Sequence, residues 1–418
     1  MESMPAATAR ANVGTTGDAA VFHKLYGVKR PRTTYYRKDF LDYVLMVSLS
    51  AAVVVAAYGP RHVVTLVALA LCAFAVAMFI ARHGIEWRVP LILRRPQDLL
   101  YMLLYKLQNL RPFYLIALAL LLLETLLVMA TPDLPHYTGV MRTAALVLFY
   151  VHLISITLFR TVILVAHLAK REHVREVLMQ TPWKRVINAR TNMTMEIVHA
   201  YATGLLAHIL LVAPWYIVIT HAHYSLLFLP VACAIDLFVH VKWMNVYNAW
   251  FYRDHWVGHN SELEFIYLHG AHHDAIPSAL IAVSDSGFLE GFLRFALSSP
   301  VAFYNPIVAF VIYMFDVKSD IEMHQYIPGV YPHLSRRMLE VFQHSTHHYG
   351  RLEPYGIGMK LDQPGVSESY KKRFARFPKG MTNSFVLEEE LTGFDWDNPT
   401  HRNTLRLWDK YQKPQGTA

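Results

Sequence analysis

The sequence contains few cysteines and few charged residues, and both shortages narrow what the protein can be. Its 418 residues include only two cysteines, Cys72 and Cys233, both inside apolar runs. This excludes a disulfide scaffold and a cysteine-based zinc or iron–sulfur site. Charged residues make up 17% of the chain and apolar residues 54%, with a mean hydropathy of +0.25. Such a balance is too apolar for a soluble chain of this length and predicts a membrane protein.

Six apolar runs are long enough to cross a hydrocarbon core of about 30 Å. Lysine and arginine concentrate in the connections on one side of these runs, with seven in the N-terminal arm, six after the second run and six after the fourth; the other connections carry one or none. Because positive residues are retained in the cytoplasm, both termini and the chain after residue 246 are predicted to be cytoplasmic. The runs lie near residues 41–58, 63–81, 113–130, 143–166, 201–220 and 224–246.

The predicted fold is all-α: a multi-pass transmembrane helix bundle with a cytoplasmic, histidine-rich helical cap. A basic cytoplasmic arm over 1–40 has no apolar core, so no cleavable signal peptide is expected there. Six spans over 41–246 precede a histidine-rich catalytic region over 247–358 and a polar cytoplasmic tail over 359–418. If all the histidines serve one site, the apolar pieces near 279–315 must form a hairpin that dips into the membrane and returns, or a pair of interfacial helices.

Histidine is the residue that the chain has in excess. There are 23 histidines, and ten of them lie between residues 255 and 348, where even spreading would give about five. Residues three and four apart share one face of a helix, so a cluster with this spacing can direct its imidazoles at one ion. Eight of the ten form three such clusters: His255-x-x-x-His259, His269-x-x-His272-His273 and His344-x-x-His347-His348.

The number of imidazoles indicates a dinuclear metal centre. Imidazole binds iron, copper, zinc and nickel, so the ligand type does not identify the metal. A single zinc ion takes three or four protein ligands, and eight or nine nitrogens exceed that number. Two neighbouring metal ions with open positions are therefore favoured. Isolated histidines such as His173, His333 and His401 are expected at ordinary surface or interfacial positions.

The order of these motifs resembles that of the fatty acid hydroxylase/sterol desaturase superfamily of membrane non-haem diiron enzymes. The resemblance covers roughly residues 240–358 and rests on HxxxH, a ten-residue gap, HxxHH, a single histidine and a second HxxHH, all after a group of spans. The short gap is similar to the hydroxylase branch. The resemblance implies two iron ions held by nine ligands: His255, His259, His269, His272, His273, His324, His344, His347 and His348.

Polar residues near the histidine clusters are candidates to hold the imidazole N–H groups. Asp320 and Glu322 directly precede His324 in the sequence, whereas His240 and Asn248 precede the first cluster. Asn248 stands seven positions before that cluster, where many members of the superfamily have an acidic residue.

Three polar residues inside the predicted spans also need an explanation, since such residues are costly in lipid. Glu124 and His152 both fall near mid-depth, and we expect them to pair in a polar pocket. Arg160 is expected to extend to the cytoplasmic edge. The other histidines in or at the ends of spans are expected to have packing or interfacial roles.

An imidazole-rich diiron centre with open positions can use O₂ to hydroxylate an unactivated C–H bond. The spans that lead to the site predict a hydrophobic, membrane-resident substrate. Neither a fused cytochrome b5 signature nor a glycine-rich dinucleotide fingerprint is present, so electrons are expected from an external soluble donor of the ferredoxin or cytochrome b5 type. No nucleic-acid-reading motif accompanies the basic residues, and no nucleic acid partner is expected.

Two alternative functions stay open at this point. The same centre could give desaturation, C–C cleavage or aldehyde deformylation instead of hydroxylation, and the motifs do not separate these outcomes. In a different class, the chain could be a metal transporter or a haem-binding membrane protein. Such proteins place histidines on facing spans within the bilayer, whereas the clusters here follow the last predicted span.

Overall fold

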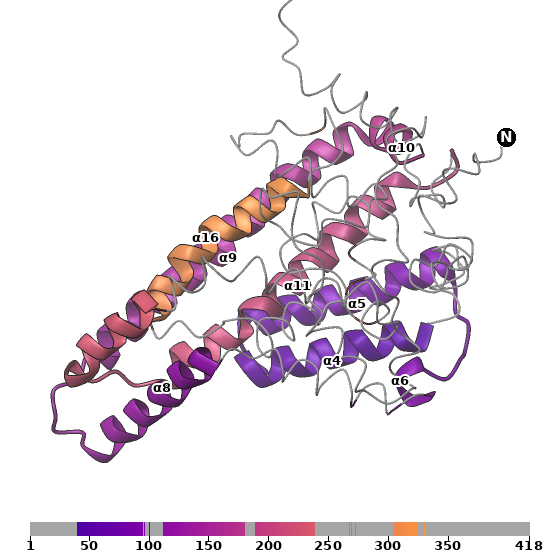
Figure 1. Cartoon of the computed structure of the whole chain (residues 1–418). Coiled ribbons are helices and arrows are strands. Elements are labelled where there is room, and N and C mark those ends of the chain that lie inside the picture. Colours follow the sequence, from indigo (N-terminus) through magenta and orange to yellow (C-terminus); the bar gives the residue numbers. More distant parts are fainter. Residues whose placement is uncertain are drawn as a thin grey trace, which may run out of the picture.

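The computed structural model describes residues 40–94, 96, 100, 112–179, 189–238, 267, 269, 272, 305–324 and 330. This part of the chain is helical and contains no strand, which confirms the all-α prediction for the described residues (Figure 1). An isolated antiparallel bridge joins His136 and Ser225. The elements are α4 (Phe40–Tyr58), α5 (Val63–His83), α6 (Leu91–Arg94), α8 (Pro112–Ala130), α9 (Thr138–Ala169), α10 (Arg171–Met179), α11 (Met193–His221), the 3₁₀ turn η3 (Leu226–Phe228) and α16 (Pro306–Met323).

Four of these helices are long and apolar enough to cross a membrane. They are Phe40–Tyr58, Val63–Arg82, Thr138–Ala169 and Met193–His221. Each of them overlaps one of the predicted runs and matches its position within a few residues at one end or at both. Two further apolar helical stretches, Leu118–Ala130 and Leu226–Phe238, are shorter. A membrane protein with at least four candidate spans is therefore supported for the described residues.

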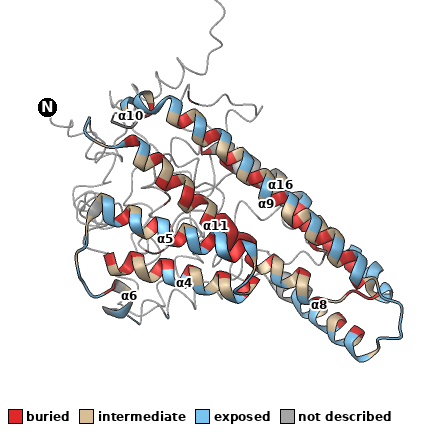
Figure 2. Ribbon diagram, turned by 180° about the vertical axis from the view of Figure 1, so that it is seen from behind, coloured by how far each residue is buried: buried red, intermediate tan, exposed pale blue. Residues whose placement is uncertain are grey.

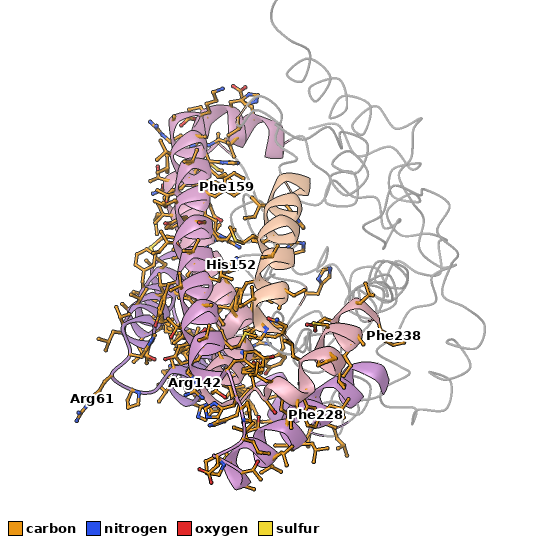
Figure 3. The ribbon with its side chains drawn as sticks, turned by 90° about the vertical axis from the view of Figure 1, so that its left-hand side faces the viewer. Arg61, Arg142, His152, Phe159, Phe228 and Phe238 are labelled. Atoms are coloured by element: carbon orange, nitrogen blue, oxygen red, sulfur yellow. The ribbon has the colours of Figure 1, made fainter. Side chains whose placement is uncertain are left out.

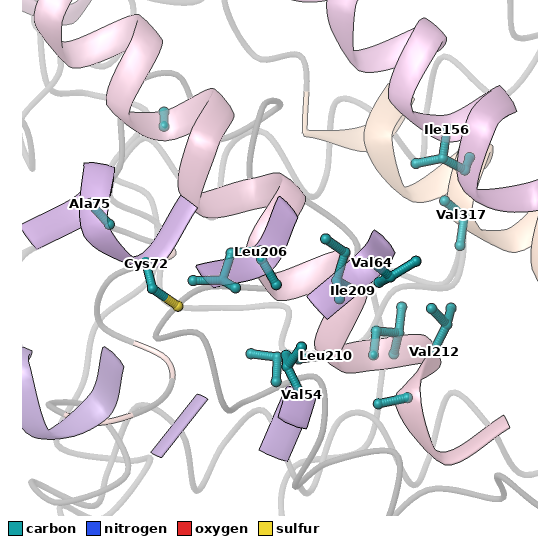
Figure 4. Packing of buried hydrophobic residues seen from close by; sticks show 14 of the residues in the cluster. Val54, Val64, Cys72, Ala75, Ile156, Leu206, Ile209, Leu210, Val212 and Val317 are labelled. Carbon is teal, nitrogen blue, oxygen red and sulfur yellow. The ribbon is translucent and has the colours of Figure 1, made fainter. Parts of the chain in front are cut away.

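Helix α11 is the central element of the bundle. It packs against α4, α5, α9 and α16, and most of its residues are buried (Figure 2). Its Leu210 and Val54 of α4 both belong to the apolar core (Figure 4). Pro214 lies inside this helix and removes one of its backbone hydrogen bonds. Five residues earlier, the carbonyl of Ile209 accepts a hydrogen bond of 2.7 Å from the Tyr58 hydroxyl, which ties α4 to α11.

Helix α9 has a buried face and an exposed face that run along its whole length. The buried face includes Phe149, His152, Ile156 and Arg160. The opposite face carries large apolar side chains that are 42–75% exposed: Val140, Val147, Val151, Ile154, Leu158, Val162 and Val165. The helix has 32 residues, about 48 Å at 1.5 Å per residue, so it exceeds the hydrocarbon thickness. A continuous apolar stripe of this kind is suited to contact with lipid.

Helix α16 lies along α9 and runs in the same direction (Figure 1). Its start is fixed by Asn305, whose backbone N–H donates a hydrogen bond of 3.1 Å to Asp236. The ring of Phe310 packs against Phe149 with 5.7 Å between ring centroids. Residues 306–315, the end of the predicted hairpin, are helical and continue without a break to Met323; residues 279–304 lie outside the described part.

The helices define two ends of the bundle. We call the "Arg82 end" the one where α4 and α11 begin and α5 and α9 end. At the opposite end, the Arg142 guanidinium donates hydrogen bonds of 3.2 Å to the carbonyls of both Ile219 and Ala222 and so caps α11. Because α16 runs parallel to α9, its last residue and the following His324 lie toward the Arg82 end.

Candidate metal centre

Three of the nine predicted metal ligands lie within the described part, and the fold brings them together. His269, His272 and His324 are 1%, 2% and 2% exposed. The ring centroids of His269 and His272 are 5.3 Å apart, and those of His272 and His324 are 4.6 Å apart. His324 is separated from His272 by 52 positions in the sequence, yet their Nε2 atoms are 3.0 Å apart. The fold therefore brings His269 and His272 of the second cluster together with His324.

The 3.0 Å separation between two imidazole nitrogens limits their protonation states. If they share a hydrogen bond, one Nε2 carries the proton and the other presents its lone pair, because two N–H groups or two lone pairs would repel each other. The same separation suits two ligands of one metal ion, since bonds of about 2.1 Å at a right angle place two nitrogens about 3.0 Å apart. The distance between the two nitrogens is thus compatible with metal binding, which requires both Nε2 atoms to be unprotonated.

His324 follows directly after the last residue of α16. Its backbone N–H donates a hydrogen bond of 3.3 Å to the carbonyl of Ile321, so the helix ends in a tight turn. Ile321 is completely buried in the apolar core, which holds this turn against the bundle. Asp320 and Glu322, the acidic residues predicted to support the site, lie in the last turn of α16, and their role stays a prediction.

A tyrosine that was not among the predicted site residues ties the second histidine cluster to α4. Tyr267, two positions before His269, is 3% exposed, and its hydroxyl donates a hydrogen bond to the Asp42 carboxylate in the first turn of α4. The same hydroxyl accepts a hydrogen bond of 3.3 Å from the backbone N–H of Ile92. The contact with Asp42 spans 225 positions of sequence, and no spacing pattern could have revealed it.

A second buried network lies at the Arg82 end between α4, α5 and α11. The Arg82 guanidinium donates to the Glu196 carboxylate (2.7 Å) and to His199 Nδ1 (2.6 Å). Arginine has only donors, so His199 Nδ1 is unprotonated and its Nε2–H donates to the Tyr43 hydroxyl at 3.1 Å. Tyr43 in turn donates to the carbonyl of Ala75 at 3.4 Å.

This network excludes one further metal site. Glu196 and His199 form a Glu-x-x-His pair on one face of α11, a spacing that dinuclear carboxylate centres use. The cationic guanidinium of Arg82 occupies the space between the two side chains. The pair therefore binds arginine and serves to join three helices, in agreement with the packing role predicted for His199.

The polar residues inside the spans differ from their predictions. The Glu124 carboxylate accepts a hydrogen bond from the backbone N–H of Ser225, whereas the His152 ring lies against the His208 ring at 5.0 Å; the predicted Glu124–His152 pair is wrong. Arg160 is completely buried and does not extend to an exposed edge. Hydropathy indicates the depth of such residues, but it does not say which neighbour each of them faces.

The remaining candidates stay predictions because they lie outside the described residues. Among the residues that the structure does describe, no group of three or more histidine, cysteine, aspartate or glutamate side chains has the geometry of a metal site. His269, His272 and His324 therefore do not form a complete metal site by themselves, and their role as ligands stays a prediction. The candidates outside the described part are His240, Asn248, His255, His259, His273, His344, His347 and His348.

Comparisons with known proteins found no relative that indicates a function for this chain. No protein-family model, no curated protein and no solved structure matches this chain. The fold and the histidine trio define the class of protein: a helical chain with spans suited to a membrane and a buried histidine cluster at the Arg82 end.

Proposed function

We propose that the protein is a multi-pass membrane non-haem diiron oxygenase that hydroxylates an unactivated C–H bond of a lipid or another hydrophobic substrate. It would use O₂, two electrons from an external soluble donor and two protons, releasing one oxygen atom as water and inserting the other into the C–H bond. In this proposal both termini and the metal site face the cytoplasm. Nine histidines would hold two iron ions: the eight of the three clusters and His324.

The single observation that carries the proposal is the meeting of His272 with His324. Two motifs that the sequence analysis assigned to one centre are buried together, with a nitrogen–nitrogen separation that suits two ligands of one metal ion. A chance pair of surface histidines would be exposed to water and would have no reason to be joined across 52 positions. His269 adds a third imidazole from the same cluster.

The residues around His269, His272 and His324 would exclude water from the site and fix the orientation of the ligands. Iron, when bound, supplies the reduction of O₂ and the removal of hydrogen from carbon. The chain supplies burial, which excludes water from the reacting groups. It also supplies the hydrogen bond from the Tyr267 hydroxyl, two positions before His269, to the Asp42 carboxylate of α4. Supports of this kind orient metal ligands, and their loss usually weakens metal binding.

The position of the trio supports a substrate that resides in the membrane. It lies at one end of a bundle whose outer surface is apolar, with exposed large side chains on α5, α8 and α9. A hydrophobic molecule can reach such a site from the lipid, while a soluble electron donor approaches the end where lysine and arginine concentrate. We infer the cytoplasmic side from this charge asymmetry.

The test is untargeted lipid and metabolite profiling of cells that express the wild-type protein or the His272→Ala variant. Hydroxylation predicts a product that is one oxygen atom heavier than its precursor, present only with the wild-type chain. His221→Ala is the matched control, because His221 is an exposed histidine at the far end of α11. A product that is lighter by two hydrogen atoms would replace hydroxylation with desaturation. No difference between wild type and His272→Ala would contradict the proposal.

A further inference from the structure

A second pair of buried histidines lies away from the candidate metal centre, in the middle of the apolar helices. His152 of α9 and His208 of α11 are 0% and 2% exposed. Their ring centroids are 5.0 Å apart, with an angle of 37° between the ring planes. The Phe310 ring of α16 lies 5.7 Å from His152, and Figure 3 shows His152 on the side of α9 that faces α16. Three helices therefore meet around these two imidazoles.

All four ring nitrogens of this pair are buried, and none of them has a hydrogen-bond partner among the described residues. Other buried histidines of the described part differ in this respect. His199 is bonded to Arg82 and Tyr43, and the Nδ1 atom of His167 bonds the carbonyl of Ile163 at 2.8 Å. A buried polar group without a partner destabilises a fold, and an apolar residue of similar shape would be tolerated better. The pair thus lowers the stability of the fold, and a role in packing alone does not explain why two histidines stand here.

The chemistry of the two rings selects the group that would satisfy them. A neutral imidazole has one N–H donor and one lone pair, so the pair offers both donors and acceptors. A hydroxyl group can donate to one ring and accept from the other. A metal cation is disfavoured, because the positive charge of the buried Arg160 acts on His208 and two neutral ligands do not offset a cation's loss of hydration. A carboxylate could use only the two N–H groups.

We propose that His152 and His208 form a binding site for the hydroxyl group of a membrane-resident, otherwise apolar ligand. The aromatic ring of Phe310 contacts His152 and would contact the apolar body of such a molecule. If the ligand bound here is the substrate on its way to the metal centre, which rests on the proposed function, the substrate is a lipid alcohol. As a binding site it stands without iron or turnover.

The experiment measures thermal unfolding of the full chain in lipid nanodiscs loaded with equal amounts of octadecanol, octadecane or octadecanoate. The variants are wild type, the double variant His152→Leu/His208→Leu, and His167→Leu. The last variant makes the same change at another buried histidine of α9, whose ring is already hydrogen-bonded. No iron is added and no activity is measured, so a negative result here is distinct from a failure of the oxygenase proposal.

For the wild type and for His167→Leu, octadecanol should raise the Tm above its value with octadecane by about 3 °C when the probe exceeds its dissociation constant about a hundredfold. The double variant should lose this difference and, without a probe, should unfold at the same temperature as the wild type or at a higher one. Equal Tm values with octadecanol and octadecane in the wild type would overturn the proposal. So would a larger, histidine-dependent effect of octadecanoate, or a double variant that still responds to octadecanol.

Discussion

The Tyr267→Phe variant gives the most detailed prediction, because it removes one hydroxyl group and keeps the ring. The lost hydrogen bond to the Asp42 carboxylate is worth about 1.5–3 kcal/mol, the range for bonds to a charged partner. The bond joins the second histidine cluster to α4 and lies far from the centre of the bundle. We therefore expect the variant to loosen the segment that carries His269 and His272 more than it lowers the global stability of the helices.

The assay is acylation of histidines by diethylpyrocarbonate, followed by mass spectrometry of each site. His269 and His272 are almost completely buried, so they react only when the segment opens. A loss of about 1.5–3 kcal/mol raises the population of the open form, and with it the rate, about 10- to 150-fold. Asp42→Asn keeps an oxygen that accepts from the Tyr267 hydroxyl but removes the charge of the acceptor, so its rate should lie between those of the wild type and Tyr267→Phe.

The control for this prediction is Tyr224→Phe. Tyr224 is also buried, at 1% exposure, but its hydroxyl has no hydrogen-bond partner in the described part of the chain. The same chemical change should therefore leave the acylation of His269 and His272 unaltered. Equal rates for Tyr267→Phe and Tyr224→Phe would refute the idea that Tyr267 holds the histidine segment in place.

Two further predictions concern the ends of the helices. Arg82→Lys should lower the free energy of unfolding by about 1–3 kcal/mol in a detergent titration, because the single ammonium nitrogen of a lysine does not reproduce the planar fork that places one nitrogen at His199 and the other at Glu196. Arg88→Lys, at an exposed ion pair, is the control and should change it by less than about 0.5 kcal/mol. Burial lowers the pKa of His62 below its usual 6.5, so its stabilising contribution is fully present above pH 6.5 and is lost as the pH falls from there through the lowered pKa. His62→Asn keeps an N-cap acceptor for α5 and should weaken the loss of stability between pH 7.5 and 5.5; an unchanged pH profile would contradict the assignment.

The helices were predictable because long apolar runs and charge-rich connections determine them locally. The run predicted at 41–58 is α4 at Phe40–Tyr58, and the run at 63–81 is α5 at Val63–His83. The limits of such reasoning appear at Arg160 and Glu124. Their depth in the bundle follows from hydropathy, but their partners depend on the rotation of each helix, which its neighbours decide.

The meeting of His269, His272 and His324 could also be expected: the spacing of HxxHH places His269 beside His272, and the resemblance to histidine-box enzymes adds His324. Tyr267 and Asp42 could not, because a contact across 225 positions leaves no periodic signal in a single sequence. The His152–His208 pair is a similar case: each residue lies in a different helix, and only packing of α9 on α11 brings the rings together.

The most direct test of the central claim is the metal content of the purified wild-type chain, measured by elemental analysis together with Mössbauer spectroscopy on protein grown with iron-57. The proposal predicts two iron ions per chain in a coupled pair, and a loss of that signal in His272→Ala while circular dichroism shows the helices intact. A folded wild-type chain that binds fewer than one transition-metal ion, after growth with sufficient iron, would contradict it.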